Sequence, residues 1–221
     1  MTDDEWSQLM TLLRRTVQDP ERRLTLFIDA PYLDYAARGE QAKSLFRALT
    51  PLPRNLLVTI GYSISKSLTL YGLRTGAFIG MSQDRGVLEE FAEVNGASAR
   101  GVWTNVPRAG MRLCSILHGD QALTTRVVQE REELRGMLRH RATMFLKEAG
   151  EVGLELMPYR SGFFMSIPTP DPERLAAALA EEQLFVVPME LGIRLAISGI
   201  ATHKIPGLAA IIKRSQQRLQ T

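Results

Sequence analysis

The sequence has few of the residues that build disulfides and metal centres. It holds one cysteine, Cys114, and three scattered histidines in 221 residues, so it offers neither an internal disulfide nor a metal-ligand spacing. No stretch reaches the eighteen or more uninterrupted apolar residues of a membrane helix, and the opening MTDDEWSQ is acidic and polar, unlike a secretory signal. The sequence thus predicts a soluble, cytoplasmic protein with no metal and no membrane span.

The chain also lacks a large excess of charge of either sign. Its 27 Lys and Arg against 24 Asp and Glu give a net charge of +3, and the basic residues form no long run and do not interleave with aromatics. This distribution argues against nucleic-acid binding. Apolar residues make up 45% and charged residues 23% of the chain, which is typical of a globular protein and excludes wholesale disorder or a collagen-like fibre.

The first part of the chain alternates helical patterns with short apolar runs, as in a slice of an open parallel α/β sheet. The expected strands are 24–28, 55–62 and 75–81, and the expected helices are 2–18, 41–49, 87–96 and 104–118. The stretch 63–73 between the last two strands is polar and is expected to be an irregular loop.

A change in pattern follows a long amphipathic helix predicted over 120–149. The remainder predicts a compact α+β piece, with strands at 154–157, 163–167, 185–187 and 193–197 and helices from 171 and from 205. We therefore predict an α/β protein with two domains, 1–122 and 123–221.

Four charged side chains stand where they could perform chemistry: Asp29, Lys66, Arg74 and Arg194. Asp29 ends a buried strand and Lys66 follows the next one, the place where open α/β sheets put their sites. A lysine among small hydroxyl residues can form a Schiff base with an aldehyde, and an arginine in a glycine-rich turn suits a phosphate. An arginine inside an apolar strand needs a carboxylate partner, from the protein or from a substrate. Taken singly, Asp29 also fits a turn former and Lys66 an exposed loop residue.

These residues lie in segments that resemble a known family. The stretch SISKSLTLYGLRTG, from Ser63 to Gly76, resembles the lysine segment of pyridoxal-phosphate-dependent aminotransferases of the aspartate/aromatic class, class I/II. Asp29-Ala30-Pro31-Tyr32 resembles their Asp-x-Ala-Tyr segment, with proline where alanine is usual, and RLAISG from Arg194 resembles their C-terminal arginine segment. Arg100 and Asn105, with Pro107, are similar to the stretch that reaches into the neighbouring subunit's site.

The resemblance implies how this sequence would hold the cofactor, pyridoxal 5'-phosphate. Lys66 would form the internal aldimine, a Schiff base, and once freed would be the base for the 1,3-proton shift. Asp29 would pair with the pyridine nitrogen and keep it protonated, which makes the ring a better electron sink. Tyr32 would donate to the ring O3' oxygen. The residues implied at the phosphate are Ser63, Ser65 and Arg74.

The resemblance also implies the substrates and the assembly. Arg194 would bind the α-carboxylate of the substrate bidentately. Arg100 holds the position at which aspartate enzymes bind the distal carboxylate of a substrate in the partner subunit, and Asn105 belongs to the same stretch. The implied reaction is amino-group transfer from an amino acid to a 2-oxo acid, performed by a homodimer.

Family members carry a long N-terminal portion before the position of Met1, which supplies the glycine-rich phosphate turn, the aromatic residue stacked on the ring and an asparagine at O3'. The expected architecture is therefore the C-terminal half of the large parallel-sheet domain of the transferase fold (1–122), with its N-terminal half absent, and the small α+β C-terminal domain (123–221). We accordingly expect an incomplete fragment of the enzyme.

Other functions fit the sequence less well. Ser63 and Lys66 have the Ser-x-x-Lys spacing of acyl-serine enzymes, but no Ser-Asp-Asn or Lys-Thr-Gly follows. The segment 61–65 approaches a nucleophile elbow but has Ser65 where glycine is needed. The more serious alternative is a non-catalytic chain of aminotransferase descent that associates with itself through an open sheet edge.

Overall fold

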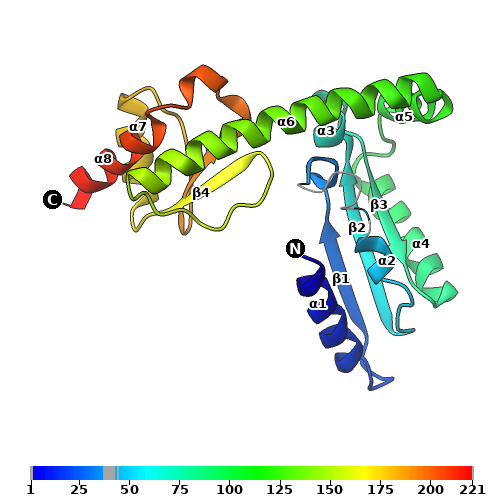
Figure 1. Ribbon diagram of the computed structural model, residues 1–221. Helices are drawn as coiled ribbons and strands as arrows, with labels where there is room; N and C mark the ends of the chain where they lie inside the picture. The colour runs from blue at the N-terminus through cyan, green and yellow to red at the C-terminus, as the bar shows by residue number, and fades with distance from the viewer. Residues whose placement is uncertain (1, 37–42, 44, 221) are drawn as a thin grey trace. The chain divides into compact units, whose positions relative to one another are not determined.

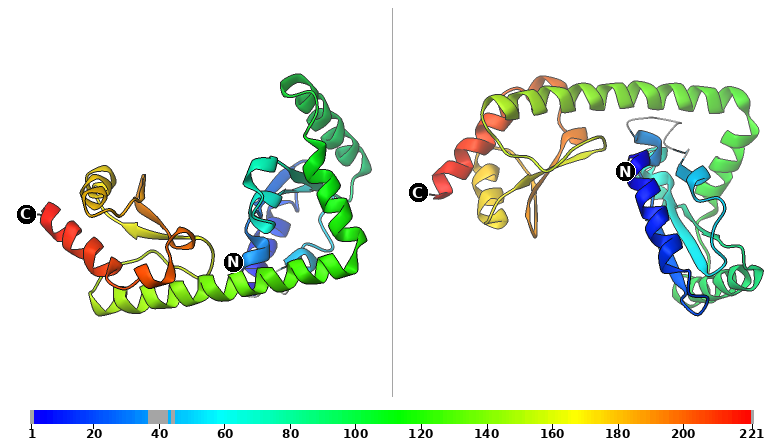
Figure 2. Two further views of the ribbon diagram at one scale, coloured as in Figure 1. Left: turned by 90° about the horizontal axis from the view of Figure 1, so that it is seen from above. Right: turned by 60° about the horizontal axis from the view of Figure 1, so that its bottom comes forward.

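The computed structural model describes residues 2–36, 43 and 45–220. They fall into two compact units, Met1–Val128 and Gln129–Thr221, and each unit carries a three-stranded sheet (Figures 1 and 2). The division lies inside the long helix α6 (Gln121–Glu151), the helix that also contains the predicted boundary between 122 and 123. Within the described residues, no helix is long and apolar enough to cross a membrane.

The sheet of the first unit has the order β1-β2-β3. Strands β1 (Leu24–Asp29) and β2 (Leu56–Ser63) are parallel, with Asp29 opposite Gly61, which confirms the predicted parallel pairing. Strand β3 (Gly76–Met81) is antiparallel to β2, and here the sheet departs from an all-parallel slice. Only the short helices α3 (Ile64–Ser67) and η3 (Tyr71–Leu73) lie between β2 and β3. A parallel return usually runs through a full crossover helix, which this connection lacks, and the chain turns back instead.

One face of this sheet forms the core of the first unit. Helix α1 (Asp3–Thr16) lies beside β1 (Figure 1) and begins at a capping box of Thr2 and Glu5. Its Trp6 is buried in one cluster with side chains of the strands. The short helix α2 (Leu45–Ala48) lies within the predicted helix 41–49, of which residues 41, 42 and 44 are outside the described part of the chain. The buried members of this core are Trp6, Met10, Ile28, Ala30, Leu49, Leu52, Leu56, Val58 and Ile60.

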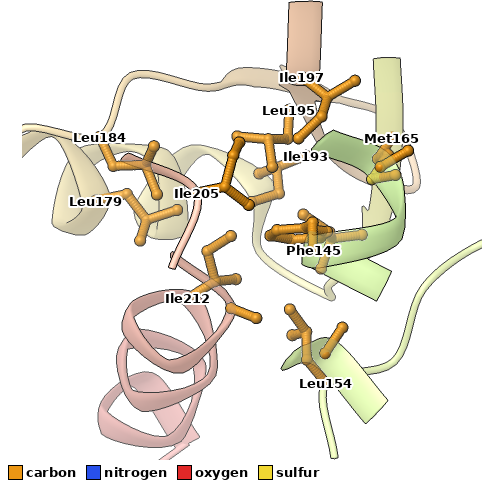
Figure 3. Packing of buried hydrophobic residues seen from close by; sticks show 14 of the residues in the cluster. Phe145, Leu154, Met165, Leu179, Leu184, Ile193, Leu195, Ile197, Ile205 and Ile212 are labelled. Atoms are coloured by element: carbon orange, nitrogen blue, oxygen red, sulfur yellow. The ribbon is translucent and has the colours of Figure 1, made fainter. Parts of the chain in front are cut away.

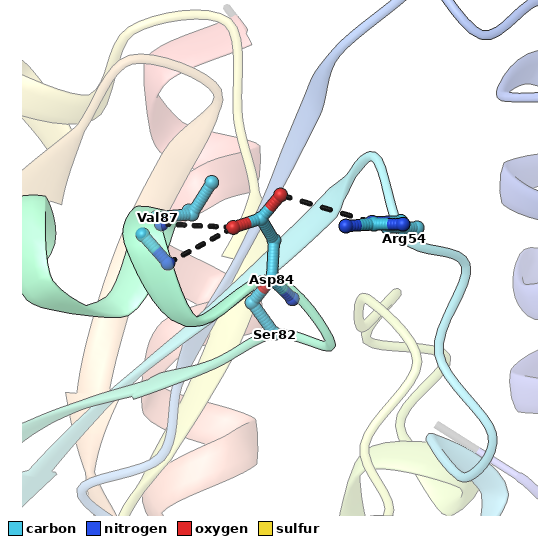
Figure 4. A network of polar contacts seen from close by, with 5 residues as sticks. Arg54, Ser82, Asp84 and Val87 are labelled. Atoms are coloured by element: carbon cyan, nitrogen blue, oxygen red, sulfur yellow. Dashed lines mark hydrogen bonds and ion pairs between the residues drawn. The ribbon is translucent and has the colours of Figure 1, made fainter.

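Helix α4 (Arg85–Val102) packs on β3 on the other side of the sheet. The ring of Phe91 lies 5.1 Å from that of Phe78, centroid to centroid. The helix begins at Asp84, whose Oδ1 accepts hydrogen bonds from the backbone N–H groups of Gly86 and Val87 at 2.9 and 3.4 Å (Figure 4). The Oδ2 atom of Asp84 lies 3.8 Å from Nε of Arg54.

The prediction that this helix ends at Gly96 was wrong, because α4 runs on to Val102. A glycine inside a helix costs only about 1 kcal/mol relative to alanine, and a well-capped helix tolerates that cost. Helix α5 (Arg108–Gly119) follows and starts four residues after the predicted start at Thr104.

The second unit is an antiparallel sheet covered by helices. Its strands are β4 (Phe164–Pro168), β5 (Val187–Met189) and β6 (Gly192–Ala196), in the order β4-β6-β5. Its helices are α7 (Pro172–Glu181), η4 (Ile197–Gly199), η5 (Thr202–Lys204) and α8 (Leu208–Gln220), together with the C-terminal part of α6. Side chains from β4, β6 and the helices α6, α7, η4 and α8 meet around Phe145, which is fully buried (Figure 3).

The predicted strand at 154–157 does not form. Only the N–H of Met157 reaches β4, donating to the carbonyl oxygen of Ser166 at 2.9 Å. One hydrogen bond does not make a ladder, so the segment that leads into β4 stays irregular despite its apolar residues.

Candidate active site

Lys66 lies just beyond the end of β2, in the short helix α3. The hydroxyl of Ser63 accepts a hydrogen bond from the backbone N–H of Ser65 at 3.2 Å and so starts this helix. The Nζ atom of Lys66 lies 3.9 Å from the centroid of the Tyr71 ring and 5.6 Å from that of the Tyr32 ring. The lysine is therefore close both to the segment that follows β1 and to the segment that follows α3.

Asp29 is the last residue of β1 and lies at the same end of the sheet as Lys66. The backbone continues the pairing by one bond, since the N–H of Ala30 donates to the carbonyl oxygen of Gly61 at 2.9 Å. The Asp29 side chain is exposed. A Cβ atom placed on Gly61 would lie 3.8 Å from Asp29 Oδ1, so this carboxylate stands over the end of β2.

The residues implied at the phosphate flank this end of the sheet. Ser65 is buried in α3, whereas Arg74 is exposed and adopts a left-handed conformation with φ of 46° directly after η3. One guanidinium nitrogen of Arg74 donates to the carbonyl oxygen of Tyr71 at 2.9 Å. This bond uses one of five N–H donors, which leaves the arginine able to bind an anion as well.

Arg100 and Asn105 lie farther along the chain, where α4 ends and the turn to α5 begins. Both are exposed. Among the described residues, no hydrogen bond or ion pair joins either of them to Lys66, Asp29 or Arg74.

Arg194 belongs to the second unit, on the central strand β6 opposite Ser166. Its guanidinium carbon lies 5.2 Å from the centroid of the Phe164 ring. Within the part of the chain that the structure describes, this guanidinium forms no ion pair with an acidic side chain. An arginine in a strand requires an anionic partner, and no carboxylate of the described residues supplies one to Arg194.

Sequence reasoning missed two groups of residues around the lysine. Tyr71 lies within the lysine segment, but its place under the ammonium group depends on the turn of η3. Asp34 and Tyr62 are joined by a hydrogen bond of 2.8 Å between segments 28 residues apart. The sequence showed only that Tyr62 stands near the end of a strand and that Asp34 follows another strand. Neither position by itself predicts that the two side chains form a pair.

Comparison with known proteins places this geometry in a family. Residues 2–212 match the family model described as aminotransferase class I and II. The chain belongs to this family. The cytoplasmic aspartate aminotransferase of Dictyostelium discoideum is 27% identical over 138 residues, which are 62% of this chain and 30% of that protein. The aromatic-amino-acid aminotransferase of Escherichia coli K12 is 26% identical over 135 residues, 61% of this chain and 32% of that protein.

Solved structures agree with the predicted fold. The crystal structure of an aminotransferase from Anaerococcus prevotii matches with a TM-score of 0.92 and 36% identity over 98% of this chain and 53% of that one. The aromatic-amino-acid aminotransferase of Burkholderia pseudomallei matches with a TM-score of 0.76 at 21% identity, a likeness of fold. The chain therefore has a partial fold of this aminotransferase type, and it spans about half the length of these solved structures.

Proposed function

We propose that this chain acts in amino-group transfer between an amino acid and a 2-oxo acid and holds pyridoxal phosphate at the ends of β1 and β2. The observation that carries the proposal is the position of the Lys66 ammonium close to the rings of Tyr32 and Tyr71, in a chain whose residues 2–212 match the aminotransferase model. The Burkholderia relative is described as covalently bound to pyridoxal phosphate.

The residues present fit this cofactor chemically. A primary amine, an exposed carboxylate and a guanidinium lie at one end of the sheet, since Lys66 follows β2, Asp29 ends β1 and Arg74 shortly precedes β3. When bound, the cofactor supplies an electron sink for the substrate's α-carbon. Asp29 would hold a proton on the ring nitrogen, and Tyr32 would donate to the ring oxygen. Lys66 would hold the aldehyde carbon and later move a proton.

The phosphate would be held by Arg74 with the hydroxyls of Ser63 and Ser65. Bidentate and charge-assisted contacts are the strong ones for such a group. Since Ser65 is buried and the Ser63 hydroxyl also caps α3, the fold of α3 would hold these two residues in place at the phosphate.

Substrate binding and assembly complete the proposal. Arg194 would bind the α-carboxylate, which supplies the anion that its strand position requires. Arg100 and Asn105, exposed at the end of α4, would reach the site of a second copy in a homodimer. A cytoplasmic location belongs to the same proposal, and the name of the Dictyostelium relative supports it.

A second candidate function is self-association without catalysis. The apolar residues at the turn from α4 to α5 favour it, because Val102 and Trp103 are 75% and 58% exposed. Apolar surface of this kind marks interaction sites when it is contiguous. Such a chain would remain colourless when pyridoxal phosphate is added.

The test is borohydride reduction of the chain in the presence of pyridoxal phosphate, followed by peptide mapping. The reduction fixes the cofactor to the lysine that holds it. We expect the label on Lys66 among the five lysines of the chain, and its loss in Lys66→Arg. Label on another lysine, or no binding at all, would contradict the proposal and favour the non-catalytic alternative.

A further inference from the structure

Asp34 is a buried acid close to the candidate site. It is 3% exposed. The hydroxyl of Tyr62 donates to its Oδ2 atom at 2.8 Å, and Nζ of Lys43 lies 3.5 Å from its Oδ1 atom. A buried carboxylate is retained only where hydrogen bonds and a counter-charge replace its water, so the hydroxyl of Tyr62 is a strong determinant of where Asp34 lies.

The two residues belong to the segments that bring Tyr32 and Lys66 together. Asp34 is in the short helix η1 (Leu33–Tyr35), two residues after Tyr32. Tyr62 is the penultimate residue of β2 and precedes Ser63, which starts the helix of Lys66. The Asp34–Tyr62 hydrogen bond therefore joins the segment after β1 to the end of β2.

The backbone alone gives the segment after β1 little support at this point. The bond from Ala30 to Gly61 is its last backbone link to β2. Beyond it, the N–H of Leu33 donates to the carbonyl oxygen of Ala30 at 3.3 Å, and that of Tyr35 donates to the carbonyl oxygen of Tyr32 at 2.9 Å. These bonds shape the turn but do not attach it to β2.

We infer that the Asp34–Tyr62 pair positions Tyr32 beside Lys66. Building on the proposed function, in which Tyr32 contacts the cofactor beside Lys66, the pair then also sets the affinity of this site for pyridoxal phosphate. Asp34 and Tyr62 act through Tyr32 and are positioning residues.

The test compares two tyrosines that each donate one hydrogen bond. Tyr62→Phe removes the bond to Asp34. The matched control is Tyr159→Phe, which removes a bond of the same length, 2.8 Å, to the carbonyl oxygen of Gly162 in the other unit. We expect hydrogen exchange of amides 30–36 to become about tenfold faster in Tyr62→Phe only, because the loss of a bond to a charged group weakens local structure by at least that factor.

A spectroscopic measurement reports on Lys66 itself. The lysines are dimethylated with a ¹³C label, which keeps their charge, and the Lys66 signal is assigned with Lys66→Arg. Ring currents of Tyr71, at 3.9 Å, and of Tyr32, at 5.6 Å, should displace this signal in the wild-type chain. In Tyr62→Phe the signal should move toward those of the exposed lysines, and in Tyr159→Phe it should stay in place.

A double-mutant cycle identifies the pair as the cause. Asp34→Ala should give the same changes as Tyr62→Phe, and the double variant should add little further. Wild-type exchange at 30–36 together with an unmoved Lys66 signal in Tyr62→Phe would overturn the inference.

Equilibrium dialysis with pyridoxal phosphate is the third measurement, and we expect about tenfold weaker binding in Tyr62→Phe. An unchanged affinity in Tyr62→Phe would overturn the link between the pair and the cofactor. If the wild-type chain binds no pyridoxal phosphate, the proposed function is overturned. Hydrogen exchange and the Lys66 signal then still decide whether the pair positions Tyr32.

Discussion

Burial raises the pKa of the Tyr159 hydroxyl, and this shift has a consequence for stability at high pH. The unfolded chain loses the tyrosine proton near the ordinary pKa of about 10, whereas the folded chain keeps it to higher pH. The folded state therefore binds more protons above that pH, and the free energy of unfolding falls as the pH rises.

We predict that the wild-type chain loses more stability than Tyr159→Phe between about pH 9.5 and 11. Urea unfolding at a series of pH values measures the difference. Both proteins share the other four tyrosines of the chain, so the difference between the curves belongs to Tyr159. Parallel curves would contradict the prediction.

Single residues were predictable where their neighbours in sequence define their surroundings. Lys66 follows an apolar run and lies among serines, so both its place at the end of a strand and its possible chemistry could be predicted. Asp34, Tyr62 and Tyr71 could not be predicted in the same way. Their contacts depend on the turns that hold Asp34 and Tyr71, and sequence spacing does not define the path of a turn.

At the scale of elements, α8 begins with a cap that comes from another helix. The carboxylate of Glu148, in α6, accepts hydrogen bonds from the backbone N–H groups of Gly207 at 2.9 Å and Ala210 at 3.2 Å. A negative charge at a helix start also meets the positive end of the helix dipole.

We predict that Glu148→Ala lowers the free energy of unfolding by about 1–2 kcal/mol, the usual value of an N-terminal cap. The matched control is Glu151→Ala in the same helix, which removes an exposed pair with Lys147 at 3.8 Å. Such pairs contribute about 0.3–0.5 kcal/mol. Chemical unfolding followed by circular dichroism measures both, and equal effects would argue against the cap.

Helix α5 approaches the candidate site at Gly110. A Cβ atom at this position would lie 2.1 Å from Oγ1 and 2.7 Å from Cβ of Thr75, the residue that follows Arg74. We predict that Gly110→Ala destabilises the chain by about 1–3 kcal/mol, as overpacking does.

Gly119→Ala is the control for this substitution, since it lies in the same helix with nothing within 4 Å of the added atom. It should leave the melting temperature unchanged or raise it. A melting temperature in Gly110→Ala as high as in this control would mean that α5 can move away from Thr75 without cost.

The elements themselves were largely predictable. Helical patterns in the sequence predicted α1, α6 and α7, and continuous apolar runs predicted β1 and β2. The errors fall where pairing or packing decides the outcome. The apolar segment 154–157 has no full partner strand, and α4 passes Gly96 because a helical glycine is only a weak stop.

At the scale of the whole molecule, the turn from α4 to α5 exposes Val102, Trp103 and Val106 at 75%, 58% and 46%. Neighbouring apolar side chains of this size favour contact with another protein surface. We predict that the mass measured by light scattering rises with protein concentration. Trp103→Glu should reduce this rise, and Trp103→Phe, which keeps an apolar ring, should preserve it. A constant monomer mass in all three proteins would contradict the prediction.

The family could be predicted from ordered motifs because those motifs are contiguous in sequence. Residues 2–212 match the class I and II aminotransferase model, in agreement with the expectation from the lysine, aspartate and arginine segments. The assembly could not be deduced in the same way, since an exposed side chain such as Trp103 does not specify its partner.

Because the division between the two units falls inside α6, between Val128 and Gln129, no loop separates them. Proteases cut exposed loops, where the backbone can extend into their active sites, far more readily than helices. Trypsin should therefore spare this boundary, although Arg126 and Arg131 lie beside it, and should cut first at segments without helix or strand, such as the one around Arg160. Digestion would then cut within the units before it could release them as separate fragments.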